Sequence, residues 1–246
     1  MKNFKSVFYS SIMAMTLALC TAFSAFAEFG PGADIAGEVI VSEAKADKVS
    51  DPIAEKLAST MTSQLTDQII LVNDHNLTLW NRQSDGSWIK DMDVYCGYGR
   101  KGLKAYTERK EGDETTPVGS FPILHAFGFG SNPGTAMTWR EITKNSYWSG
   151  EKSTYNTWVE STTPVGGEHL SEYTICYKYA MAIGFNQNPT VYKRGSAIFL
   201  HCKNPEDWGS AGCVSVTEDN MLTLLQKCHD GCYIMIVPNE DYISNF

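Results

Sequence analysis

The pattern of hydrophobic positions changes its period near residue 66. Before that point, hydrophobic residues recur every four positions, which is the spacing of one helical face: Ile53, Leu57, Met61 and Leu65. Asp51 and Pro52 stand where an N-cap and a first helical residue are expected. The spacing therefore predicts one short helix that lies against the domain that follows.

From residue 68 onward, hydrophobic and polar residues alternate, as they do in half-buried strands. Strands are predicted over residues 68–72, 78–81 and 88–95, with turns at 74–76 and 84–86. Another strand is predicted near 116–123, and residues 232–237 form the closing one. Short strands joined by tight turns predict a mainly β fold, an antiparallel β-sandwich or barrel with a few short helices.

Two further segments complete the pattern. Residues 125–172 are rich in small polar and aromatic residues, and so long an irregular stretch is typical of a lid or cleft wall, with a decorated surface loop as the alternative. Thr217 is a good N-cap for a second helix, whose first turn carries Glu218 and Asp219. Gly231 is expected to end this helix in the left-handed conformation.

The first 27 residues have the features of an export signal. Lys2 and Lys5 precede a nearly uncharged hydrophobic run, and Ala25-Phe26-Ala27 fits the small-x-small cleavage rule. We expect a signal peptide over 1–27, a linker plus the short helix over 28–65, and the main domain over 66–246. The expected location is secreted or extracytoplasmic, without stable membrane insertion after cleavage; a retained membrane anchor is the alternative.

Charge and cysteine content narrow the class of protein. The net charge is −8, and an acidic chain without basic runs argues against nucleic acid as a partner. Six cysteines follow the expected cleavage site, and an exported chain with an even number commonly forms disulfides. We expect Cys213 and Cys202 to be free, and one bridge among the remaining four remains open: Cys96, Cys176, Cys228 and Cys232.

The most informative residues are His201 and Cys213. His201 comes at the end of a hydrophobic segment, and Cys213 follows twelve residues later in Ser210-Ala211-Gly212-Cys213. A free thiol is only a few per cent ionised at neutral pH, so a nucleophilic cysteine needs a neighbouring base such as imidazole. We expect a carbonyl near Cys202 to fix the tautomer of His201. A structural role for the pair remains open, because glycine before a buried cysteine is also an ordinary core feature.

The small residues before Cys213 have their own consequence. Ala211 and Gly212 let the main chain approach a substrate closely. The N–H groups of Gly212 and Cys213 are therefore expected to be free to hold a developing oxyanion.

Three motifs resemble the L,D-transpeptidase catalytic domain family (YkuD-type). The first is Ser196-x4-His201 followed by Ser210-x-Gly212-Cys213. The segment Thr116-Pro117-Val118-Gly119-Ser120-Phe121 resembles the family's TPxGxF motif, and residues 68–102 resemble its opening strands. The motifs occur in the family's order and cover about residues 66–238.

The resemblance implies a cysteine acyl-enzyme that acts on peptidoglycan stem peptides. The bond after the third stem residue is attacked, a terminal D-alanine leaves, and the acyl group passes to an amine of another stem, giving a 3→3 cross-link, or to water. Cys213 is then the nucleophile, His201 the base, and Gly212 with Cys213 the oxyanion donors. Carbapenem-type β-lactams are expected inhibitors, and no cofactor or metal is implied.

The resemblance also suggests substrate contacts. Ser196, Ser210 and Ser215 are expected to line the acyl pocket. Trp148, Tyr155 and Asn156 are expected in the cleft wall. Many family members carry Arg or Asn near the cysteine, whereas Ala211 and Ser215 stand in the corresponding places here, so the anchoring of the acceptor is expected to differ.

Other functions remain as alternatives. An L,D-carboxypeptidase would hydrolyse the same acyl-enzyme. A non-catalytic peptidoglycan-binding relative is also open, in which Cys202 and Cys213 form a resting disulfide. A zinc module is disfavoured because the spacing Cys228-x3-Cys232 fits no paired zinc motif. A sortase is disfavoured because it needs an arginine after the cysteine, and the last arginine is Arg194.

Overall fold

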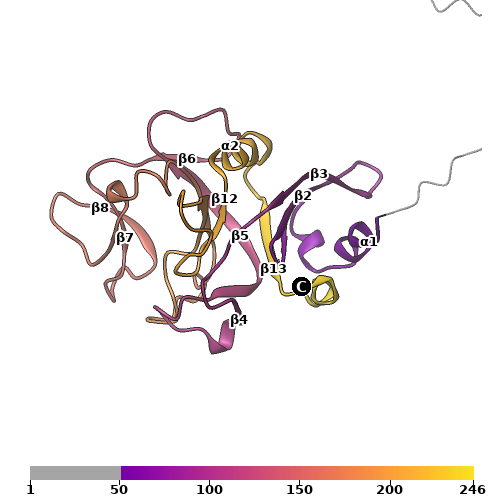
Figure 1. The fold of residues 1–246 in the computed structure, drawn as a ribbon, viewed down its shortest axis with the longest axis horizontal. Helices are drawn as coiled ribbons and strands as arrows, with labels where there is room; N and C mark the ends of the chain where they lie inside the picture. Colours follow the sequence, from indigo (N-terminus) through magenta and orange to yellow (C-terminus); the bar gives the residue numbers. More distant parts are fainter. Residues whose placement is uncertain (1–50) are drawn as a thin grey trace, which may run out of the picture. The chain divides into compact units, whose positions relative to one another are not determined.

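A computed structural model describes residues 51–246, so the expected signal peptide and residues 28–50 of the expected linker lie outside the described residues. Within that range, ten strands form one main sheet in the order β12-β11-β10-β5-β13-β1-β2-β3, with β4 and β6 also paired to β5 (Figure 1). These strands are β1 (Gln68–Asn73), β2 (Asn76–Arg82), β3 (Trp88–Tyr95), β4 (Leu103–Ala105), β5 (Thr116–Gly128), β6 (Trp139–Glu141), β10 (Tyr179–Ile183), β11 (Phe199–Cys202), β12 (Val214–Val216) and β13 (Tyr233–Val237).

The mainly β prediction is confirmed, and the sheet is mixed rather than purely antiparallel. The three predicted opening strands form the antiparallel meander β1–β2–β3. By contrast, β1 pairs in parallel with β13, and β11 pairs in parallel with β12. Alternation in the sequence identifies a strand but not its partner, and the parallel pair β1–β13 joins the two ends of the domain.

The period-two pattern of β1 places its side chains in two different cores. Ile70 and Val72 face one core, together with residues of helix α2 (Glu218–Lys227). Ile69 and Leu71 face the other, which is covered by helix α1 (Pro52–Ala58) and the 3₁₀ helix η4 (Glu240–Asn245). Because both faces are buried, each such side chain contributes about 1.5–3 kcal/mol of hydrophobic stabilisation.

Helix α1 begins as predicted but ends earlier. The Asp51 carboxylate accepts a hydrogen bond from the backbone N–H of Ile53, as an N-cap does. The helix ends at Ala58, where the hydroxyls of Ser59 and Thr60 donate to backbone carbonyls of the last turn. The prediction that the helical face continues to residue 65 is therefore wrong: two of its members are exposed, Met61 by 76% and Leu65 by 66%.

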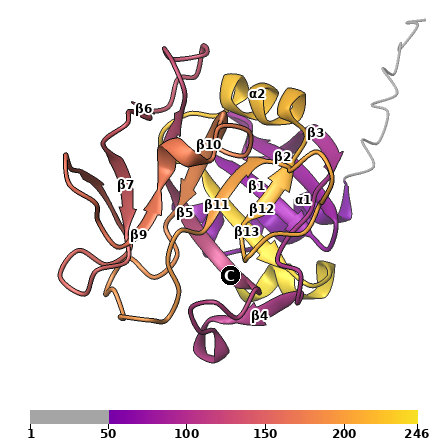
Figure 2. The ribbon, with the colours of Figure 1, turned by 60° about the vertical axis from the view of Figure 1, so that its left-hand side comes forward.

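The segment 125–172 is more regular than its sequence indicates. It contains the end of β5, strand β6 and a separate three-stranded sheet in the order β8-β7-β9. Its strands are β7 (Ser146–Ser149), β8 (Thr157–Glu160) and β9 (Gly167–His169). Both views place β7 on the side of the main sheet away from β3 (Figures 1 and 2). Strands of three or four residues are too short for an alternating pattern to be recognised.

Three further 3₁₀ turns connect these elements: η1 (Thr62–Gln64), η2 (Tyr106–Glu108) and η3 (Leu170–Glu172).

Helix α2 has the predicted start and a different end. The Thr217 hydroxyl accepts a hydrogen bond from the N–H of Asn220 at 3.3 Å, which confirms it as the N-cap. The helix ends at Lys227, with Cys228 as its C-cap. Gly231 does adopt a positive φ of 93°, but it lies in the turn before β13 and not at the helix end.

The six cysteines within residues 51–246 are all free. Cys202 is unpaired as expected, and the bridge left open among the other four is not formed. The resting disulfide between Cys202 and Cys213 is not formed either. The Cys202 thiol donates to the carbonyl of Tyr179 at 3.5 Å and packs in the main core, whereas Cys213 packs in a different cluster with Phe199.

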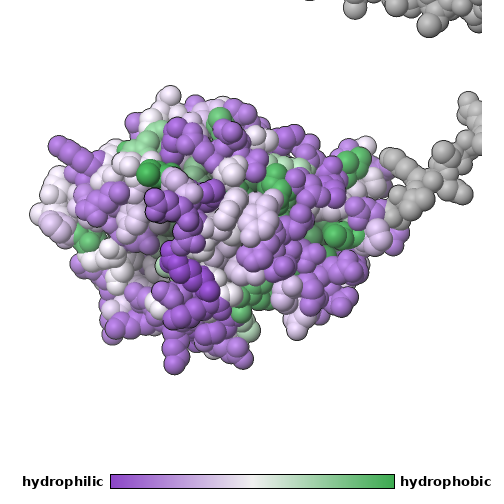
Figure 3. All heavy atoms as spheres, viewed as in Figure 1, coloured by the Kyte–Doolittle hydropathy of each residue, from purple (hydrophilic) through white to green (hydrophobic). Residues whose placement is uncertain are grey.

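The face of the molecule shown in Figure 3 carries mostly hydrophilic side chains, and the hydrophobic ones appear as small separate spots. In the part of the chain that the structure describes, no helix has the length and hydrophobicity needed to cross a bilayer.

Candidate active site

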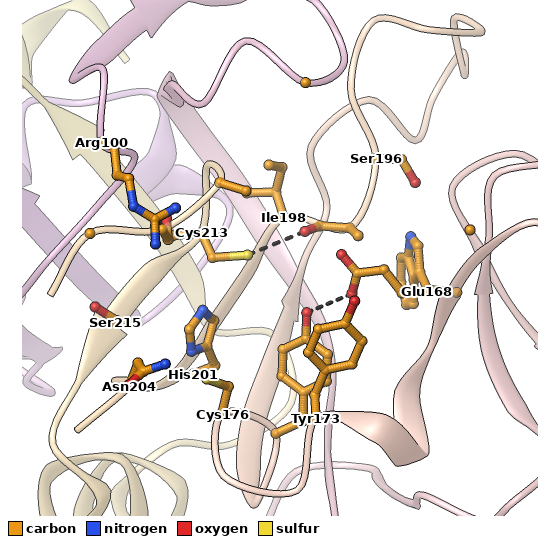
Figure 4. A pocket seen from close by; sticks show the side chains of 18 of the residues that line it. Arg100, Glu168, Tyr173, Cys176, Ser196, Ile198, His201, Asn204, Cys213 and Ser215 are labelled. Carbon is orange, nitrogen blue, oxygen red and sulfur yellow. Dashed lines mark hydrogen bonds between the residues drawn. The ribbon is translucent and has the colours of Figure 1, made fainter. Parts of the chain in front are cut away.

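A pocket of about 400 Å³ lies between the β11–β12 region and the small sheet (Figure 4). His201 and Cys213 line it from the main sheet, and Trp148 and Glu168 line it from β7 and β9. The fold thus brings the two residues that the sequence singled out to one opening.

His201 is held in the form of a neutral base. It lies on β11 next to Cys202, and its Nδ1 lies 2.7 Å from the Cys202 carbonyl oxygen. A carbonyl oxygen can only accept a hydrogen bond, so Nδ1 carries the proton and Nε2 keeps its lone pair. Burial lowers the pKa of His201 from its usual 6.5, so the ring is uncharged at neutral pH and able to take a proton.

The Cys213 thiol is buried and protonated. Its sulfur accepts a hydrogen bond from the Phe199 N–H and donates one to the Ala197 carbonyl, both at 3.3 Å. The pKa of Cys213 is raised to about 12, chiefly by burial and next by the Glu168 carboxylate, while the Phe199 N–H and the Arg109 cation act in the opposite direction. The thiol proton is therefore directed to Ala197 in this structure and not to His201.

The turn that carries Cys213 requires glycine at position 212. Gly212 has a φ of 140°, and a Cβ atom there would lie 2.9 Å from the Thr115 carbonyl oxygen. The Gly212 N–H donates to the Ser210 hydroxyl at 3.0 Å, and this hydroxyl donates to the Cys213 carbonyl at 2.6 Å. The expectation that the Gly212 N–H is free for an oxyanion is therefore wrong, because Ser210 occupies it.

A buried arginine behind this turn was missed by sequence reasoning. The Arg109 side chain is 2% exposed and pairs with Asp113 at 3.2 Å, while its Nε and Nη1 have no hydrogen-bond partner. Its Nη2 lies 3.3 Å from the position that a Cβ of Gly212 would take. The available signal was the Arg109-x3-Asp113 spacing just before the Thr116-Pro117 motif.

The predicted serines have different roles. Ser196, Ser210 and Ser215 all line the pocket. The Ser215 hydroxyl donates to the Trp208 carbonyl at 2.9 Å, and the Ser210 hydroxyl stabilises the cysteine turn. Among these three serines, the hydroxyl of Ser196 makes no hydrogen bond to another residue within 51–246.

Tyr155 and Asn156 do not contact the pocket. They are 4% and 2% exposed and are not among the residues that line it, so a direct substrate contact by either one stays a prediction that the geometry does not favour. The Asn156 side chain accepts hydrogen bonds from Trp148 Nε1 at 2.9 Å and from the Ala197 N–H at 3.1 Å. It thus fixes Trp148 and Ala197, which do line the pocket.

A second residue that the sequence did not reveal is Glu168. It is partly buried on β9, and its carboxylate accepts a hydrogen bond from the Tyr177 hydroxyl at 2.6 Å. Figure 4 shows it pointing into the space that the Cys213 thiol also faces. Burial raises the pKa of Glu168 above its usual 4.5. Strand β9, which carries Glu168, has only three residues, so no alternating pattern in the sequence marks its position.

The side chains of residues 51–246 provide no cluster of metal ligands. No group of three or more His, Cys, Asp or Glu side chains there is arranged to hold a metal ion.

Comparisons with solved structures give matches of low sequence identity and low TM-score. The helical cell shape determining protein Pgp2 from Campylobacter jejuni is 16% identical, with a TM-score of 0.40, and the match covers 75% of this chain and 58% of that one. L,D-transpeptidase 1 from Mycobacterium tuberculosis is 14% identical, with a TM-score of 0.35, and the match covers 70% and 59%. This chain therefore matches less than two thirds of the length of those proteins.

The family assignment rests on a sequence comparison. No curated protein matches the chain. The family profile of the L,D-transpeptidase catalytic domain, YkuD, matches residues 67–237. That range covers more than half of the chain and includes His201, Cys213 and the Thr116-Pro117 motif, so the chain belongs to the YkuD family of L,D-transpeptidase catalytic domains.

Proposed function

We propose that this protein is an exported cysteine L,D-transpeptidase that acts on peptidoglycan stem peptides through an acyl-enzyme on Cys213. The observation that carries the proposal is the pair of groups in one pocket: a neutral His201 with a free Nε2, and the Cys213 thiol. The signal-like features of residues 1–27 support export, and the family's activity supports the substrate class.

The first half of the reaction forms the acyl-enzyme. As a stem peptide binds, the Cys213 proton leaves the Ala197 carbonyl and passes to Nε2 of His201, while the sulfur attacks the carbonyl after the third stem residue. The Cys213 N–H is the donor that we assign to the oxyanion, a contact worth about 3–4 kcal/mol in comparable enzymes. His201 then returns the proton to the departing D-alanine amine, and the C–N bond breaks.

The second half releases the acyl group. An amine of another stem peptide, or water, attacks the thioester carbonyl, the C–S bond breaks and the thiol is restored. Because burial keeps Cys213 protonated in the empty site, the sulfur becomes nucleophilic when a substrate lies beside His201. This arrangement limits side reactions of the free enzyme.

The test is incubation with purified tetrapeptide muropeptides followed by mass spectrometry. Dimers that have lost D-alanine support a transpeptidase, and tripeptides alone support the alternative L,D-carboxypeptidase. Cys213→Ala and His201→Ala should abolish or strongly reduce both products. Cys228→Ala is the matched control, because this thiol is buried but does not line the pocket.

Absence of any product from folded protein would contradict the proposal and favour a non-catalytic peptidoglycan-binding relative. Circular dichroism of each variant separates loss of chemistry from loss of fold.

A further inference from the structure

The position of Glu168 is fixed by the small sheet. Glu168 pairs with Trp148 in the register of β9 against β7. The preceding Gly167 has a φ of 119°, and a Cβ atom there would lie 2.2 Å from the Trp148 carbonyl oxygen. The two strands therefore approach too closely for any other residue at 167, and this contact sets where the Glu168 side chain enters the pocket.

The carboxylate is held from one side and open on the other. The Tyr177 hydroxyl donates to one oxygen at 2.6 Å, and Figure 4 shows the carboxylate between the wall of the small sheet and the thiol. No lysine, arginine or histidine within residues 51–246 forms an ion pair with Glu168. A partly buried carboxylate without a cationic partner is costly, so its presence needs an explanation.

Its charge opposes the first step of the reaction. A carboxylate near Cys213 raises the pKa of the thiol, and a pocket built only to ionise the sulfur would not contain one. Arg100, which lines the pocket, is already paired with Asp207 at 2.8 Å, and Arg109, whose cation acts on Cys213, pairs with Asp113 at 3.2 Å. Glu168 therefore has no ion-pair partner of its own in the pocket, and its carboxylate is complementary to an ammonium group.

We propose that Glu168 binds the ammonium group of the acyl acceptor and takes its proton, so that the thioester is transferred to a primary amine in preference to water. This inference rests on the proposed function of Cys213. A primary amine has an ordinary pKa of about 10.4 and therefore arrives protonated and unreactive.

The step balances in atoms and charge. The acceptor ammonium gives one proton to the Glu168 carboxylate, and the neutral amine attacks the thioester carbonyl. The C–N bond forms, the C–S bond breaks, and the second proton of the amine passes through His201 to the departing sulfur. Glu168 then releases its proton to solvent. Its raised pKa brings it closer to that of the amine and makes it a stronger base than an exposed glutamate.

The experiment measures how the acyl group partitions. The donor is a tetrapeptide muropeptide, and the acceptor probe is Nα-acetyl-lysinamide, which offers one primary amine. Mass spectrometry gives the ratio of amide product to hydrolysed tripeptide. The variants are Glu168→Gln and Glu168→Asp. Glu172→Gln is the matched control, because Glu172 is close in sequence but its side chain is 71% exposed and outside the pocket.

The proposal predicts that Glu168→Gln lowers the amide-to-tripeptide ratio by about tenfold or more and raises the KM for the acceptor. Glu168→Asp should restore part of the ratio, and Glu172→Gln should match the unmodified protein. In the unmodified protein the ratio should fall as the pH drops through the pKa of Glu168, because the protonated carboxyl neither attracts nor deprotonates an ammonium. Glu168→Gln should lack that dependence.

Two results would overturn the inference. One is an unchanged ratio in Glu168→Gln, and the other is equal loss of Cys213 acylation and amine transfer, which marks Glu168 as a positioning residue for the thiol. Acylation by a carbapenem is measured in parallel. If the unmodified protein is not acylated, the proposed function fails; if it is acylated but Glu168→Gln partitions normally, only this inference fails.

Discussion

The hydroxyl of Thr116 donates a hydrogen bond to the carbonyl of Gly212 at 2.7 Å. The same hydroxyl accepts one from the Gly99 N–H at 2.9 Å. The Thr116-Pro117 motif, at the start of β5, therefore holds the turn before Cys213 in place, although the two lie 96 residues apart. This contact gives a physical reason for two motifs of the family to occur together.

Thr116→Val should weaken the cysteine turn. The change leaves the Gly99 N–H and the Gly212 carbonyl without their partner, which costs about 1–3 kcal/mol when the groups are buried. We expect acylation of Cys213 to slow by at least about tenfold, measured by stopped-flow with a carbapenem. Thr60→Val is the control: its buried hydroxyl also donates at 2.7 Å, to the Leu57 carbonyl, and neither residue lines the pocket. Equal slowing in both variants would contradict this account.

Arg109 should promote ionisation of Cys213. Its cation lowers the pKa of that thiol, and its unpartnered Nε and Nη1 leave its charge only partly compensated by Asp113. In Arg109→Met we expect slower carbamidomethylation of Cys213 at a fixed alkaline pH, by about tenfold for each unit that the thiol pKa rises. Arg109→Lys should recover part of the rate.

The measurement for Arg109 is peptide mapping after iodoacetamide treatment over a range of pH. Arg82→Met, a substitution outside the pocket lining, provides the control. A normal alkylation rate in folded Arg109→Met would contradict the assigned electrostatic effect.

The pH dependence of acylation should report on His201. Burial lowers the pKa of His201 from 6.5, so the ring is protonated, and unable to accept the thiol proton, only at pH values below that point. The carbapenem acylation rate should therefore rise with pH through a midpoint below 6.5 and stay high at neutral pH. In His201→Ala this limb should vanish and the rate fall by about 10²–10⁴-fold. The same pH profile in both proteins would contradict the assignment of His201 as the base.

Local patterns predicted the parts of the fold that depend on local physics. Alternating residues located β1, β2 and β3 within one or two residues, and the Thr217 N-cap gave the start of α2. The pairing of β1 with β13 is set by tertiary packing and has no local signal. The helical period over residues 53–65 predicted too long a helix, because the hydroxyl groups of Ser59 and Thr60 bond to carbonyls of the last turn and the helix ends at Ala58.

The residues of the candidate site also fall into those that local sequence predicts and those that only tertiary packing brings together. His201 and Cys213 were predicted because their chemistry and spacing are visible in one segment. Arg109 and Glu168 reach the pocket from distant elements, so only the folded structure reveals them. Tyr155 and Asn156 were predicted from their place in the segment expected to form the cleft wall, and that placement does not distinguish the wall itself from the residues that support it.

Because α1 ends at Ala58, two leucines of the same hydrophobic repeat, Leu57 and Leu65, should differ in their effect on stability. Leu57 is fully buried, whereas Leu65 is 66% exposed. Leu57→Ala should lower the free energy of unfolding by about 2–5 kcal/mol, and Leu65→Ala should change it by less than about 0.5 kcal/mol. Urea denaturation followed by circular dichroism measures both. Similar losses in the two variants would indicate a continuous helix packed through residue 65.

The central claim is that Cys213 carries the acyl group. Intact-mass spectrometry after incubation with a carbapenem, followed by peptide mapping, tests it most directly, with Cys176→Ala as a control because Cys176 lines the same pocket. The account predicts a single adduct on Cys213 that persists in Cys176→Ala and disappears in Cys213→Ala. An adduct that survives in Cys213→Ala, or no adduct on the folded unmodified protein, would contradict it.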